Sequence, residues 1–125
     1  MTNKKILYVE NDPSSLLFIK RLLEKKYDFD SAPNDKDAMQ KLAENEYDLV
    51  LMDIMLGGKL DGVEIMRWAK DFKPESKTLF LAITTQSYSL GEENFLTKGF
   101  DGYFSKPLDI DNFISSIDLL LENTK

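Results

Sequence analysis

Residues Asp48-Leu49-Val50-Leu51-Met52-Asp53 form the stretch that decides the fold. Four consecutive apolar residues lie between two acids, which is a poor pattern for an amphipathic helix. The same pattern is typical of a strand buried on both faces, as in a parallel sheet. Because ligands of open α/β sheets bind at the carboxyl ends of the strands, Asp53 is predicted to lie at the binding edge of the fold.

Other short segments are predicted as strands of the same sheet. They are bounded by polar or turn residues and cover Lys5–Val9, Phe29–Ala32, Leu79–Ile83 and Gly102–Phe104. The segment Phe29–Ala32 is less apolar than its neighbours, which favours a position at the edge of the sheet.

Helical patterns lie between these strands. Asp12 and Pro13 predict the N-cap and first turn of a helix, and either Asn34 or Asp35 can cap a second one. A third helix is expected to open at Asp61-Gly62 and to end before Pro74. The last helix follows a 3.6-residue period, with apolar residues at Ile110, Phe113, Ile114, Ile117, Leu120 and Leu121.

The segment Ser87–Lys98 carries the weakest helical pattern. Its apolar residues are poorly supported between a glycine and several polar residues, so we expect it to be the least firmly packed element. With this helix included, strands alternate with helices along the whole chain. The sequence therefore predicts an α/β fold in which helices cover both faces of a parallel sheet, as a single domain over residues 1–125.

Composition excludes several kinds of chemistry. The 125 residues contain no cysteine and no histidine, so disulfides, thiolate metal sites and imidazole bases are impossible within this chain. No signal-peptide core and no membrane-spanning apolar run are present, and we expect a cytoplasmic protein that does not bind membranes. The net charge of −6 argues against direct nucleic-acid binding and favours hard cations and basic partner surfaces.

Polar side chains follow the predicted strands at the points where they end. They are Glu10, Asn11, Asp12, Asp53, Thr84 and Lys106. Because the carboxyl ends of parallel strands share one edge, we expect these residues to converge. Acids so close repel one another unless oxygen ligands hold a divalent cation, most naturally Mg²⁺. A lysine and a hydroxyl suit a phosphoryl group, so the set predicts phosphoryl transfer to an aspartate.

In the order and spacing of these residues, the sequence resembles the receiver (REC) domain of two-component response regulators. The resemblance covers essentially the whole chain, and it rests on the acidic turn after Ile6-Leu7-Tyr8-Val9, the strand ending at Asp53, Asp61-Gly62, Thr84, and Tyr103-Phe104-Ser105-Lys106-Pro107. It implies a flavodoxin-like (βα)5 fold, a doubly wound parallel sheet with strand order 2-1-3-4-5.

The resemblance also implies roles for individual residues. Asp53 matches the phosphorylation site and also touches the metal, while Glu10 and Asn11 match the pair that binds Mg²⁺. The backbone carbonyl of Met55 matches a further metal ligand.

The remaining roles concern the phosphoryl group and the switch. Lys106 matches the lysine that pairs with the phosphoryl group, and the bond to Pro107 is often cis in this family. Thr84 matches the hydroxyl that turns toward the phosphate. Tyr103 matches the aromatic residue that swings inward once this hydroxyl has moved.

Three features depart from the common family pattern. Asn11 stands where most relatives have an aspartate, which predicts weaker Mg²⁺ binding unless Asp12 compensates. The loop that contains Leu56–Leu60 is one residue longer than the commonest form and lacks its usual proline, as in a recognised subgroup. Thr85 is bulkier than the small residue usual after the switch hydroxyl.

The resemblance implies a Mg²⁺-dependent phosphoacceptor domain of a phosphorelay. A histidine kinase or histidine phosphotransfer protein is the expected donor, and the surface of Ser87–Lys98, Gly102–Phe104 and the last helix is expected to signal to a downstream protein partner or output domain. Phosphorylation is also expected to allow two copies of the domain to dimerise. Enzymatic activity is expected to be limited to self-phosphorylation and slow autodephosphorylation. The chain fits either a stand-alone regulator or a receiver from a longer protein.

Two other interpretations remain open from the sequence. Asn11 and Thr85 favour a pseudo-receiver, a protein-interaction module that signals without phosphorylation. A Mg²⁺-dependent phosphohydrolase on a related fold ranks last, because the chain is short of a cap or substrate pocket.

Overall fold

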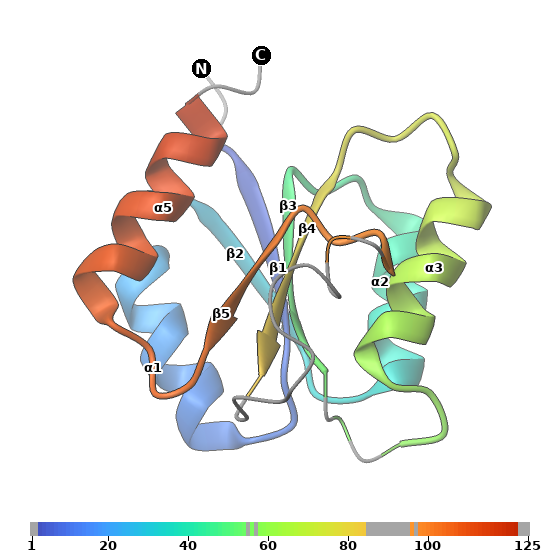
Figure 1. The fold of residues 1–125 in the computed structure, drawn as a ribbon, viewed down its shortest axis with the longest axis horizontal. Coiled ribbons are helices and arrows are strands. Elements are labelled where there is room, and N and C mark those ends of the chain that lie inside the picture. Colours follow the sequence, from blue (N-terminus) through green and yellow to red (C-terminus); the bar gives the residue numbers. More distant parts are fainter. Residues whose placement is uncertain (1–2, 55, 57, 85–95, 97, 123–125) are drawn as a thin grey trace.

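The computed structural model describes residues 3–54, 56, 58–84, 96 and 98–122. Its strands are β1 (Lys5–Val9), β2 (Asp28–Ala32), β3 (Leu49–Asp53), β4 (Leu79–Thr84) and β5 (Gly102–Ser105). They form one sheet in the order β2-β1-β3-β4-β5, and each neighbouring pair is parallel (Figure 1). The predicted fold class and the edge position of β2 are confirmed.

Four helices lie within the described residues: α1 (Pro13–Leu23), α2 (Asp35–Glu44), α3 (Gly62–Phe72) and α5 (Ile110–Glu122). Asp12 caps α1, and Asp61 forms a capping box at the start of α3, as the sequence predicts. For α2 the structure selects Asn34 as the cap, whose side chain accepts a hydrogen bond from Asp37 N. The predicted helix over Ser87–Lys98 lies outside the described residues except at positions 96 and 98.

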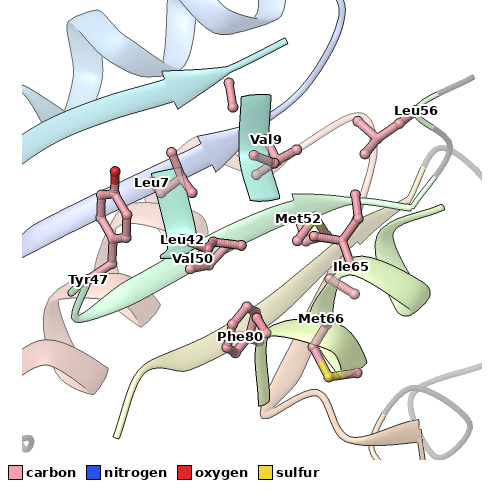
Figure 2. Packing of buried hydrophobic residues seen from close by; sticks show 14 of the residues in the cluster. Leu7, Val9, Leu42, Tyr47, Val50, Met52, Leu56, Ile65, Met66 and Phe80 are labelled. Atoms are coloured by element: carbon pink, nitrogen blue, oxygen red, sulfur yellow. The ribbon is translucent and has the colours of Figure 1, made fainter. Parts of the chain in front are cut away.

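Helices cover both faces of the sheet, as Figure 1 shows. Side chains of α1 and α5 join one buried cluster, and those of α2 and α3 join the other. Successive residues of a strand point to opposite faces, so Leu7 and Val9 enter the α2/α3 cluster while Ile6 and Tyr8 enter the α1/α5 cluster. Figure 2 shows the α2/α3 cluster around Val50 and Met52. None of the helices in the described ranges has the length and apolar character to cross a bilayer.

The strand register brings the polar residues together at one edge. Val9 pairs with Met52 and Asp53 with Ile83, so Glu10, the residue after Val9, comes level with Asp53. At the other side Thr84 pairs with Ser105, and the backbone N of the next residue, Lys106, donates to Thr84 O at 2.7 Å. Hydrogen bonding between strands therefore fixes the relative positions of residues far apart in the sequence.

A polar cluster around the edge strand β2 supports a stability prediction. Tyr47 OH donates to Asp30 Oδ2 at 2.7 Å, and Lys41 Nζ donates to Asp30 Oδ1 at 2.6 Å. Burial alone would raise the pKa of Asp30, but these hydrogen bonds outweigh it and hold the pKa below its ordinary value of 3.8. We expect Tyr47→Phe to lower the free energy of unfolding by about 1 kcal/mol at pH 7.

The pH dependence of this effect follows from the lowered pKa of Asp30. The stabilisation is fully present above the unfolded-state pKa of 3.8 and is lost as the pH falls through the lower folded-state pKa. The difference between wild type and Tyr47→Phe should therefore shrink between pH 7 and pH values below 3.8 in urea denaturation. An equal difference at both pH values would contradict this account.

Candidate functional site

Glu10 is a buried acid directly after β1, with 2% of its surface exposed. Its Oε1 accepts hydrogen bonds from Tyr8 OH at 2.9 Å and from the ammonium group of Lys106. Its Oε2 lies 3.4 Å from the backbone N of Asp12, which donates to it. Three donors thus orient a carboxylate that burial would otherwise make costly.

Asp53 ends β3 and is 4% exposed. Its side chain lies beside that of Glu10, so the two acids form one buried pair. Burial would raise the pKa of Glu10, but the hydrogen bonds from Asp53, Lys106 and Tyr8 and the charge of Lys106 hold it below its ordinary value. The pair therefore supplies a concentrated set of oxygen atoms at the edge of the sheet.

Lys106 brings a positive charge to this pair. The residue follows β5, and its peptide bond to Pro107 is cis, as predicted from the family resemblance. The side chain is 20% exposed, and its ammonium group forms an ion pair with Glu10. Because Glu10 in turn lies beside Asp53, the structure brings three of the predicted site residues together.

Thr84 and Tyr103 lie on the neighbouring strands β4 and β5. Thr84 ends β4 and is 1% exposed, and its backbone carbonyl holds Lys106 N. Tyr103 lies on β5, is half-buried and packs against the α2/α3 cluster. The structure places both residues where the sequence predicts them, and their switch roles stay predictions. Thr85 lies outside the described residues.

Asn11 and Asp12 occupy the exposed rim of the site. Asn11 Nδ2 donates to the backbone carbonyl of Leu56 at 3.1 Å, which links the turn after β1 to the loop after β3. Asp12 Oδ2 accepts from Ser15 N at 3.1 Å and from Ser15 Oγ at 2.7 Å. These hydrogen bonds lower the pKa of Asp12 and occupy its side chain in capping α1.

The donor set fits Mg²⁺ in its chemistry. Mg²⁺ binds through one or two carboxylates and neutral oxygens and keeps several waters. Glu10 and Asp53 supply two buried carboxyl groups, and Asn11 holds Leu56 through its nitrogen, so that its Oδ1 can face a cation. Among the described residues no group of three or more acids is placed to hold a metal ion. The predicted ligand Met55 lies outside the described residues.

Tyr8 contributes to the site although the sequence shows it only as a buried strand residue. Its side chain is fully buried, and its hydroxyl bonds Glu10. The spacing of Tyr8 and Glu10 could have indicated this contact, because residues two apart on a strand lie on the same face. Burial and the neighbouring acids Glu10, Asp53 and Asp12 raise the pKa of Tyr8, so the hydroxyl keeps its proton and stays a donor.

This contact predicts a stability effect. We expect Tyr8→Phe to lower the free energy of unfolding by about 1.5 kcal/mol, because it removes a buried hydrogen bond to a charged group while keeping the ring. Urea denaturation of the two proteins at pH 7 measures the difference. A variant as stable as wild type would show that the Tyr8 hydroxyl does not support Glu10.

Comparisons with known proteins agree with this arrangement. The family model described as response regulator receiver domain matches residues 6–118. Response regulator ArlR of Staphylococcus saprophyticus is 34% identical over 118 residues, which cover 94% of this chain and 52% of that protein. Polar-differentiation response regulator DivK of Brucella anthropi is 29% identical over 115 residues, which cover 91% of this chain and 93% of that protein.

A solved structure gives the same result for the fold. The receiver domain of the Francisella response regulator 1452 superposes with a TM-score of 0.87 at 27% identity, over 98% of this chain and 100% of that one. This chain spans about half the length of ArlR and of the transcriptional regulatory protein DltR of Streptococcus agalactiae, at 52% and 50%. The family match, the sheet order and the buried site residues lead to one conclusion: this chain belongs to the receiver domains of two-component response regulators.

Proposed function

We propose that this receiver domain accepts a phosphoryl group on Asp53 in a Mg²⁺-dependent reaction and transmits the change to a protein partner. The observation that carries the proposal is the buried contact of Asp53 with Glu10 and of Glu10 with Lys106. This arrangement combines a nucleophilic carboxylate, a metal-binding acid and a cation at the carboxyl edge of the sheet.

In the proposed reaction a carboxylate oxygen of Asp53 attacks the phosphorus of the donor in line with the bond that breaks. A new P–O bond forms, and the P–N bond of a phosphohistidine or the P–O bond of an acyl phosphate breaks, with the electron pair leaving on the departing group. The Lys106 ammonium then binds a phosphoryl oxygen. Burial of Asp53 at 4% exposure limits access of water to the product.

The proposed metal ligands are Glu10, Asp53, Asn11 and the backbone carbonyl of Met55. Bound Mg²⁺ would neutralise charge on the phosphoryl oxygens in the transition state. Glu10 is firmly oriented, because Tyr8 and Lys106 both donate to it.

The proposed signal starts where Lys106 and Thr84 meet. The backbone bond from Lys106 N to Thr84 O joins the ends of β5 and β4, so movement of either residue toward a phosphate acts on β5. Tyr103 lies on β5, half-buried, and can respond to the space that Thr84 leaves. The surface of the segment 87–98, β5 and α5 is the proposed output face.

Exposed apolar side chains of α1 and a cavity beside the site support docking of a protein donor. Leu17 and Phe18 on α1 are 49% and 51% exposed. A cavity of about 330 Å³ between α1 and the chain after β5 is lined by Tyr8, Ser15, Phe18, Ile19, Lys106, Pro107, Leu108 and Ile110. We propose a histidine kinase or histidine phosphotransfer protein of the cytoplasm as the partner that binds here.

The proposal is tested by incubating the protein with acetyl phosphate and Mg²⁺ and measuring its intact mass. We expect one added phosphoryl group, and no addition when a chelator replaces Mg²⁺. An unchanged mass with Mg²⁺ would overturn the proposal and favour the pseudo-receiver, for which the similarity to ArlR and DivK gives no support. An adduct that forms equally well with chelator would overturn the role of the metal.

A further inference from the structure

An acidic residue of α2, Asp35, contacts the loop between β3 and α3. Asn34 caps α2, which leaves the next residue, Asp35, for another contact. Asp35 Oδ2 accepts a hydrogen bond from the backbone N of Leu60 at 3.1 Å, and its Oδ1 accepts from Lys36 N at 2.8 Å. One carboxylate therefore joins the first turn of α2 to a loop that lies 25 residues further along the chain.

Gly58 packs against the same carboxylate. A Cβ atom at position 58 would lie 3.0 Å from the carboxyl carbon of Asp35 and 3.0 Å from each of its oxygens. This distance is shorter than ordinary van der Waals contact, so an added side chain at position 58 would press on the carboxylate. Two independent observations, the Leu60 hydrogen bond and the Gly58 contact, thus place the loop on Asp35.

The loop is tied to the site at its other end as well. Ile54, directly after Asp53, donates through its backbone N to Ile83 O at 3.0 Å. The carbonyl of Leu56 accepts from Asn11 Nδ2 at 3.1 Å, and the Leu56 side chain is 3% exposed. Asp35 completes this set of attachments on the α2 side, and the loop between them follows the proposed phosphoacceptor.

We propose that Asp35 is a positioning residue for the cation site, which it supports by holding the loop after β3 against α2. The proposal rests on the proposed function in one respect: Asn11, one of the expected ligands, is held by the Leu56 carbonyl of this loop. Asp35 touches neither cation nor phosphate and acts through Leu60 and Gly58. The hydrogen bonds from the Leu60 and Lys36 amides lower the pKa of Asp35, which keeps its carboxylate ionised as an acceptor at neutral pH.

The test compares Asp35→Ala with Asp37→Ala by calorimetric titration with Mg²⁺ and by hydrogen exchange of the loop amides. Asp37 lies in the same first turn of α2, so both variants lose a favourable charge at the helix N-terminus, but only Asp35 contacts the loop. We expect Asp35→Ala to raise the Kd for Mg²⁺ by about tenfold, in the range known for residues that orient metal ligands. Exchange at residues 58–61 should accelerate, while Asp37→Ala should leave both properties unchanged.

Two further variants separate positioning from general damage. Asp35→Asn keeps an acceptor oxygen and should restore most of the Mg²⁺ affinity. Gly58→Ala disturbs the same contact from the loop side, so its effect should be non-additive with that of Asp35→Ala in the double variant. Full additivity would show that the two changes act independently and would overturn the proposal.

The inference and the proposed function fail in different ways. Wild-type protein that binds Mg²⁺ and accepts phosphate while Asp35→Ala behaves identically overturns the inference alone. Wild-type protein that binds Mg²⁺ but accepts no phosphate overturns the proposed function. The Kd values for Mg²⁺ of wild type and Asp35→Ala still test the inference in that case. Wild-type protein without Mg²⁺ binding overturns both.

Discussion

Asp53→Asn is expected to abolish the phosphoryl adduct that wild-type protein forms with acetyl phosphate and Mg²⁺. The amide of asparagine lacks the nucleophilic carboxylate oxygen that forms the acyl phosphate. The side chain keeps its size, and its NH₂ group can donate a hydrogen bond to the neighbouring Glu10 carboxylate. The fold should therefore survive, with a free energy of unfolding no lower than that of wild type.

Asp48→Asn is the matched control for this experiment. Asp48 stands just before β3, at the opposite end of the strand from Asp53, and accepts a hydrogen bond from Lys5 N at 2.8 Å. Because it lies far along the strand from Glu10 and Lys106, its variant should still gain one phosphoryl group. Retention of the adduct in Asp53→Asn would assign the phosphoryl group to a different residue.

Gly62→Ala is expected to cause a larger loss of stability than either Tyr8→Phe or Tyr47→Phe. A Cβ atom at position 62 would lie 2.6 Å from the backbone O of Asp53 and 2.7 Å from Met52 Cγ. The first of these neighbours is backbone at the end of a central strand, which cannot move without disturbing β3 and its contacts. We expect a loss of about 3 kcal/mol in the free energy of unfolding, the upper part of the range for overpacked sites.

The matched control is Gly102→Ala. There the nearest atom to an added Cβ is Leu81 Cδ2 at 3.2 Å, the end of a flexible side chain. Urea denaturation should show a much smaller change for Gly102→Ala, and phosphorylation by acetyl phosphate should slow only in Gly62→Ala, because only that change pushes on Asp53. Equal stabilities of the two variants would show that helix α3 approaches β3 less closely than the structure indicates.

Most of the fold and part of the site could be predicted because they depend on local pattern and on one topological rule. The apolar run before Asp53 identifies a strand buried on both faces, and each β3 residue is indeed buried. Parallel strands end at a shared edge, so Glu10, Thr84 and Lys106 could be placed near Asp53 without coordinates. Hydrogen bonds between neighbouring strand ends then bring them together.

The remaining contacts depend on how side chains pack in three dimensions. Asn34 and Asp35 are both good N-caps, and only the structure shows that Asn34 caps α2 while Asp35 bonds the loop at Leu60. The sequence indicates only a core role for Tyr8, because the apolar pattern of the strand does not show that the Tyr8 hydroxyl bonds Glu10. Sequence patterns report periodicity and composition, and they carry no distances between side chains.

The most direct test of the central claim identifies the residue that carries the phosphoryl group. Protein phosphorylated by acetyl phosphate can be reduced with borohydride, which converts an aspartyl phosphate into homoserine, and peptide mass spectrometry then locates the altered residue. The account predicts homoserine at position 53 and at no other aspartate. Homoserine at another position, or unmodified Asp53 in protein that has gained a phosphoryl group, would contradict it.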